Sequence, residues 1–154
     1  MAKKVSDEIC LENVEKMKEL FSDVIGDADR FRVVYGCGVD VGMMNFVVVR
    51  KTTYTYASYA IGFDETANEI VILPINRDFS SYGDPIYVKK DEVKKAKISM
   101  FSKEIRIQSN KFPKKYITFT VQEMLNQDPD EVAICVKQEE EANAFLQFFK
   151  TKFS

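Results

Sequence analysis

The alternation of side chains between residues 53 and 63 constrains the fold of this chain most strongly. Tyrosine, serine, alanine and glycine at even positions alternate with threonine, alanine, tyrosine, isoleucine and phenylalanine at odd positions. A period of two is that of a β-strand, whose successive side chains point to opposite faces. The polar residues 64–68 have the length of a hairpin connection, and residues 69–75 are apolar again. The pattern therefore predicts an antiparallel hairpin formed by residues 53–63 and 69–75.

Other short segments with strand character surround this hairpin. Gly36-Cys37-Gly38 is interpreted as a turn or bulge between the first two strands, and residues 91–96 as a short helical turn or an irregular crossing. A succession of short hairpins closes into a barrel or a sandwich, and the sequence leaves both open. The further strands are predicted at residues 30–36, 39–50, 86–88, 97–101, 104–108, 116–121 and 132–136. The pair 97–101 and 104–108 is expected to form a tight hairpin about Ser102-Lys103.

Two amphipathic helices are predicted at the two ends of this series. Residues 6–25 carry one apolar stripe, and residues 139–153 carry a second one that is rich in phenylalanine. The C-terminal stripe suits a hydrophobic plug for an open barrel end. The first stripe consists of Cys10, Val14, Met17, Phe21 and Val24, and the second of Ala142, Phe145, Leu146, Phe149 and Phe153.

The composition is that of one globular domain. The chain has 154 residues, 45% hydrophobic and 30% charged, so it can bury a core without disulfides or metals. The three cysteines are odd in number and distant in sequence, which favours buried thiols over a secreted disulfide framework. No apolar stretch follows the basic N-terminus as in a signal peptide, and no run is long enough to span a bilayer. We expect a cytoplasmic protein.

The residue types argue against catalysis. The chain has no histidine, so Ser–His and Cys–His nucleophiles cannot be built from it. There is no C-x-x-C pair and no P-loop or dinucleotide-binding motif, so we expect no metal and no cofactor. The glycine-rich run of residues 36–42 lacks the strand-to-helix context of a phosphate loop. The sequence therefore predicts a protein that is not an enzyme.

One basic segment lies between two acidic ends. Residues 84–120 carry ten basic and four acidic residues, whereas residues 1–29 and 121–154 are both acidic, and the whole chain has a net charge of −2. Basic residues with interleaved aromatics can bind phosphates or anionic headgroups, and the alternative is a solvated face paired with the acidic helices. The candidate ligand-binding residues are Lys89, Lys90, Lys94, Lys95, Lys97, Lys111, Lys114 and Lys115.

The meander of strands followed by a C-terminal amphipathic helix resembles a pleckstrin-homology-like domain, and its central strands resemble those of the bacterial members. The resemblance is carried by Val132-Ala133-Ile134-Cys135-Val136 before the helix Gln138 to Phe153, and by the stretch from Pro85-Ile86-Tyr87-Val88 to Ile98. It covers roughly residues 30–153. It implies a mainly β (α+β) fold, an antiparallel barrel of about seven strands capped by the C-terminal helix. Residues 30–154 would form this domain, and residues 1–29 an extra N-terminal helical extension.

The resemblance also implies binding or scaffolding. Some family members bind phosphoinositides through a basic loop between the first two strands, but Gly36-Cys37-Gly38 would be that loop here, and it holds no basic residue. We expect a protein partner or a second copy, with no nucleic acid. One alternative is an anionic lipid or phosphate ligand, with peripheral contact at an anionic membrane surface. Another is a small barrel carrier or enzyme with a pocket lined by Tyr54, Tyr56, Tyr59, Tyr82 and Tyr87.

Overall fold

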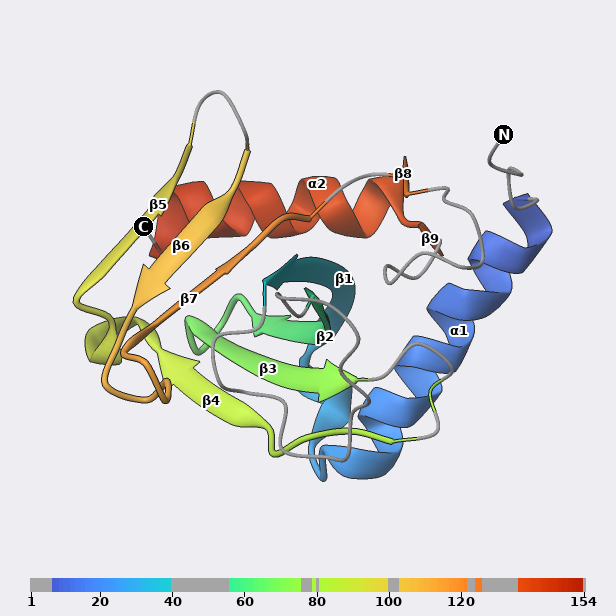
Figure 1. Ribbon diagram of the computed structural model, residues 1–154, viewed down its shortest axis with the longest axis horizontal. Helices are drawn as coiled ribbons and strands as arrows, with labels where there is room; N and C mark the ends of the chain where they lie inside the picture. The colour runs from blue at the N-terminus through green and yellow to red at the C-terminus, as the bar shows by residue number, and fades with distance from the viewer. Residues whose placement is uncertain are drawn as a thin grey trace.

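The computed structural model describes residues 7–39, 56–75, 79, 81–99, 103–121, 124–125 and 136–153 (Figure 1). In this part of the chain the fold is α+β, with two antiparallel sheets of four and three strands and one helix towards each end. The predicted mixture of strands and helices is confirmed. The predicted strand 39–50 lies outside the described residues apart from its first residue.

The first sheet is a meander of four strands in the order β1-β2-β3-β4. Their bounds are Arg32–Val39, Tyr56–Asp64, Glu69–Ile75 and Ile86–Lys89. The hairpin predicted from the period-two alternation is β2–β3, with Ile61 opposite Ile72. Every residue of β3 is buried, because layers of the protein cover both faces of this sheet.

The second sheet has three strands in the order β5-β6-β7. They span Lys95–Ile98, Ile105–Gln108 and Tyr116–Phe119. The ambiguous residues 91–96 resolve into a 3-10 turn, η2 (Lys90–Glu92), followed by the start of β5. The predicted hairpin exists, but its first strand runs over 95–98 instead of 97–101. A smaller pair, β8 (Met124–Leu125) and β9 (Val136–Lys137), follows, so only the end of the predicted strand 132–136 is described.

The interpretation of Gly36-Cys37-Gly38 as a turn or bulge was wrong, because β1 continues through these residues to Val39 in unbroken register with β2. A side chain at Gly38 would place its Cβ 2.4 Å from the carbonyl oxygen of Thr118, so glycine is required for the close approach of two backbones. Cys37 and Thr120 exchange backbone hydrogen bonds of 3.1 and 2.8 Å. This bridge joins the two sheets. The residues between β1 and β2 lie outside those described.

Two hydrophobic clusters lie on the two faces of the first sheet. One cluster fills the space between the sheets and takes Phe145, Phe148, Phe149 and Phe153 from the C-terminal segment. The other joins the opposite face of the first sheet to the N-terminal helix through Met17 and Phe21. The molecule is therefore layered as helix, four-stranded sheet, core and three-stranded sheet.

Both predicted helices are confirmed. Helix α1 spans Asp7–Val24, and α2 spans Glu139–Phe148 with a π-helical turn at Phe149–Phe153. Phe148 lies outside the predicted stripe of the second helix, yet it is only 2% exposed and packs against Phe63. No helix in the described residues is both long and apolar enough to cross a membrane. Among the described strands no closed barrel is found, since β4 and β5 are edge strands that do not pair with each other.

Candidate functional site

The outer face of the three-stranded sheet collects basic and polar side chains in a regular grid. Alternate residues of β5, β6 and β7 face the core, so the residues between them point outward. Lys95, Gln108 and Tyr116 form one row across the strands, and Lys97, Arg106 and Thr118 form the next. These six residues are called the basic face below.

Two cations of the basic face lie directly opposite each other. Lys97 on β5 is the cross-strand partner of Arg106 on β6, and like charges at such positions are destabilising. The guanidinium carbon of Arg106 lies 4.3 Å from the centroid of the Tyr116 ring. This cation–π contact holds Arg106 over the sheet and does not neutralise it.

Within the described residues, no carboxylate forms an ion pair with Lys95, Lys97 or Arg106. The nearby Glu92 is engaged elsewhere, because it accepts the backbone N–H of Lys89 at 2.9 Å and lies 3.5 Å from the ammonium of Lys111. The Lys89 hydrogen bond, aided by the charge of Lys111, lowers the pKa of Glu92 below its ordinary value. The basic face thus keeps its positive charge exposed.

Three predicted lysines lie beside the basic face at the turn between β4 and β5. Lys90 donates from its ammonium to the carbonyl oxygen of Phe153 at 2.5 Å, which places a cation at the C-terminal end of the last helical segment. The Lys94 backbone N–H donates to the Gln108 carbonyl at 2.8 Å. Lys89 and Lys94 have exposed side chains, whereas the ammonium of Lys90 is used by the fold itself.

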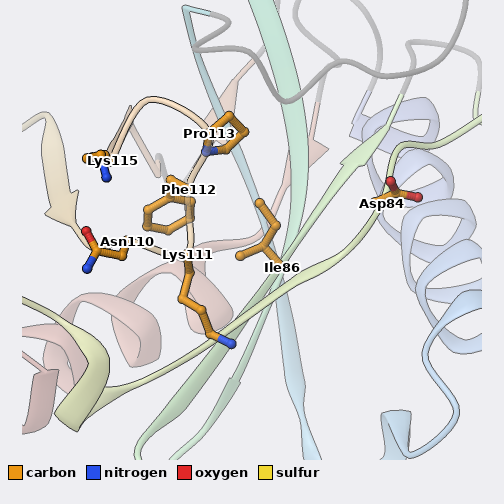
Figure 2. Close-up of a pocket in the computed structure, with 7 residues that line it drawn as sticks. All are labelled: Asp84, Ile86, Asn110, Lys111, Phe112, Pro113 and Lys115. Atoms are coloured by element: carbon orange, nitrogen blue, oxygen red, sulfur yellow. The ribbon is translucent and has the colours of Figure 1, made fainter.

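The remaining predicted lysines belong to the loop between β6 and β7, which borders a cavity of about 430 Å³ (Figure 2). The loop is held by its own hydrogen bonds, including Ser109 N–H to the Lys115 carbonyl at 3.0 Å. Lys111 and Lys115 line the cavity, while Lys114 is exposed and is not among the lining residues. Figure 2 shows Asp84 on the far side from the loop. The lining residues are Asp84, Ile86, Asn110, Lys111, Phe112, Pro113 and Lys115.

The eight predicted lysines are therefore divided between two surfaces and a structural turn. Searches of protein-family models, curated proteins and solved structures find no match to this chain.

Arg106 was not among the predicted site residues, because only the clusters of lysine were taken as evidence for a ligand site. The strand pairing of the predicted hairpin would have indicated Arg106, since side-chain alternation places it on the same face as the outward-pointing lysines.

A second charged group, around Arg30 at the β2–β3 turn, was also missed. The Arg30 guanidinium lies 2.8 Å from Asp64 and 2.8 Å from Glu69, and its Nε lies 2.6 Å from Asp27. Burial raises the pKa of Asp64, but the Arg30 hydrogen bond and the backbone N–H groups of Ala67 and Thr66 outweigh it and lower the pKa. This network closes the β2–β3 turn, and every charge in it is paired.

The predicted tyrosines do not share one environment. Tyr59 is fully buried in the core between the sheets, while Tyr87 packs at the cluster on the opposite face of the first sheet. Tyr82 is 49% exposed. Tyr54 and the side chain of Tyr56 lie outside the described residues. Because side chains alternate across a strand, Tyr59 and Tyr87 face opposite sides of the sheet and cannot line one pocket.

Proposed function

We propose that this chain is a non-enzymatic binding domain that takes an acidic protein surface on its basic face. The observation that carries the proposal is the register that sets Lys97 directly opposite Arg106 on the solvent side of the sheet. A fold gains nothing from this pairing, because like charges facing each other across two strands repel. An acidic partner would relieve the repulsion.

The expected interaction is electrostatic and sensitive to salt. Exposed ion pairs contribute only about 0.2–1 kcal/mol each, so three cations support modest affinity. The Debye length falls from about 30 Å at 0.01 M salt to about 8 Å at 0.15 M, which weakens such contacts. The Tyr116 ring covers one flat side of the Arg106 guanidinium. A carboxylate can still approach Arg106 along the edge of the guanidinium.

The test is the binding of a labelled poly-glutamate peptide to the whole chain. Fluorescence anisotropy measures the binding at low and at moderate salt. The double substitution Lys97→Gln and Arg106→Gln is expected to weaken binding about tenfold, since two exposed charge contacts are lost. The matched control is Lys16→Gln with Lys152→Gln, which removes two exposed charges from other surfaces. Equal loss in both double variants would contradict a specific role for the basic face.

We further infer that the fold is a pleckstrin-homology-like barrel. What supports this proposal is the order of the elements, a four-stranded and a three-stranded antiparallel sheet followed by an amphipathic helix that covers the core between them. The resemblance implies binding or scaffolding, in agreement with the proposed role. An experimental structure in which the two sheets pack flat without a shared corner would favour a sandwich instead.

A second candidate is a small phosphate-bearing ligand or anionic lipid headgroup in the loop cavity. The specific observation is that Lys111 and Lys115 both line this cavity. Co-sedimentation with vesicles that contain phosphatidylserine, compared with neutral vesicles, tests the lipid, and inorganic phosphate as a competitor tests the free anion. Binding that survives Lys115→Gln would dispose of this candidate.

A further inference from the structure

The basic face raises the question of which acidic surface it would accept, and the chain itself offers one. Five of the six acidic residues of helix α1 follow one another at spacings of four, three, four and four, and all five are exposed: Glu8, Glu12, Glu15, Glu19 and Asp23. At 3.6 residues per turn these positions fall within an arc of about 80°. The buried residues Met17 and Phe21 lie on the opposite side of the helix. The five residues are called the acidic ridge below.

The acidic ridge is uncompensated in the same way as the basic face. Like charges separated by four residues on a helix repel and destabilise it. Within the described residues, none of the five carboxylates forms an ion pair, although Lys16 and Lys18 belong to the same helix. In the part of the chain that the structure describes, a row of carboxylates on α1 and a group of cations on the three-stranded sheet thus form no ion pairs.

The two surfaces cannot meet within one molecule. Helix α1 covers one face of the four-stranded sheet, and the three-stranded sheet lies across the core on its other face. The acidic ridge points away from the first of these contacts and the basic face away from the second. Figure 1 shows α1 and the β5–β6 hairpin on opposite sides of the molecule. A contact between ridge and face therefore requires two molecules.

The spacing of the charges also matches. Carboxylates four residues apart on a helix are separated by about 6 Å along the axis. Lys95 and Lys97 are two residues apart on a strand, which separates them by about 7 Å. A helix laid along β5 and β6 can thus place successive carboxylates near Lys95, Lys97 and Arg106.

We propose that the acidic ridge of one copy docks on the basic face of a second copy, head to tail. This inference rests on the proposed function and names its partner. Such a contact is heterologous, because it uses different surfaces on the two molecules, so a docked pair keeps one free face on the first copy and one free ridge on the second. The chain then assembles into open rows or closed rings, depending on the rotation between neighbours.

The test is sedimentation equilibrium of the whole chain over a wide range of concentration at low and moderate salt. The average mass of the unaltered chain is expected to rise with concentration at low salt and to fall back when salt is added. One variant loses the basic face through Lys95→Gln, Lys97→Gln and Arg106→Gln. The other loses the acidic ridge through Glu12→Gln, Glu15→Gln and Glu19→Gln. Each variant alone is expected to remain at the mass of one chain.

The decisive sample is an equal mixture of the two variants. The first retains a ridge and the second retains a face, so the mixture is expected to reach the mass of two chains and stop there. A mixture that stays at the mass of one chain overturns the proposal, as does an unaltered chain that is monomeric throughout. Circular dichroism checks that each variant is folded. If a triple variant unfolds, the charge-exchange variant Lys97→Glu with Glu15→Lys is used instead, and it is expected to restore association.

The poly-glutamate experiment separates this inference from the proposed function. If the chain binds poly-glutamate through Lys97 and Arg106 but does not associate, the acidic partner is a different protein and the self-docking proposal fails alone. If it associates but the variants do not complement each other, another surface joins the copies and the proposal fails as well. If neither binding nor association occurs, both proposals are wrong.

Discussion

The Arg30 guanidinium forms ion pairs with three carboxylates that lie close together. Its guanidinium contacts three carboxylates, of which Asp64 and Glu69 have side chains only 10% and 7% exposed. A buried carboxylate without such a partner would favour its protonated form, because burial disfavours charge. The Asp64 Oδ1 atom also accepts the N–H groups of Thr66 and Ala67 at 2.9 and 3.1 Å. The network therefore fixes the β2–β3 turn.

The substitution Asp64→Asn tests this network. The folded-state pKa of Asp64 is lowered, so its contribution is complete above the unfolded pKa of about 3.9 and is lost as the pH falls through the folded value. We expect Asp64→Asn to reduce the free energy of unfolding by about 1–2 kcal/mol at pH 7. Denaturant unfolding across the pH range should show the gap closing in acid. The control, Asp29→Asn, alters an exposed carboxylate nearby, and an equal loss there would count against the network.

At the scale of elements, the crossing of β1 and β7 depends on a missing side chain. At Gly38 a Cβ would lie 2.4 Å from the Thr118 oxygen and 3.1 Å from the Phe119 Cα, both backbone atoms. We expect Gly38→Ala to cost about 2–4 kcal/mol of stability, because the two strands must move apart. Thermal and denaturant melts measure the effect. Gly26→Ala, where no atom lies within 4 Å, should change stability by less than about 0.5 kcal/mol.

The elements differ in how far the sequence could predict them. The β2–β3 hairpin follows from alternation alone, because each of its strands has strong local preference. The start of β5 was placed too late, since Lys95 and Lys97 carry none of the apolar signal of a strand. Gly36 and Gly38 looked like a turn because their need for space comes from distant strands: from Ile61 on β2 at Gly36, and from β7, about eighty residues further along the chain, at Gly38. The basic face was found only in part for the same reason, since strand register brings Arg106 beside the lysines.

For the molecule as a whole, α1 is bound into the fold through a complementary pair. Phe21 is fully buried, and a Cβ at Gly62 would lie 2.4 Å from its ring, so the ring occupies the space that a side chain on β2 would need. Phe21 also meets Phe31 edge to face, with ring centroids 6.0 Å apart. The division of the chain into an N-terminal extension, residues 1–29, and a domain, residues 30–154, remains a prediction. The contacts of Phe21 allow this prediction to be tested.

We expect Phe21→Ala to lower the free energy of unfolding by about 3–5 kcal/mol, because a large cavity opens between the helix and the sheet. If α1 and the sheets unfold as one unit, the denaturant transition stays single and moves to lower denaturant concentration. A separate early transition for the helix would instead support an independent extension. Leu11→Ala, on the same helix but 50% exposed, is the matched control and should have little effect.

The aromatic covering of the inter-sheet core is added late in protein synthesis. Strand β1 leaves the ribosome more than a hundred residues before Phe145, Phe148, Phe149 and Phe153, which complete the core that it lines. At about 5–20 residues per second, the inner face of β1 waits roughly 10 s for these rings. During this interval the nascent chain exposes apolar strands with open edges, the kind of surface that general chaperones hold. Translation speed and chaperone supply should therefore govern the yield of folded protein.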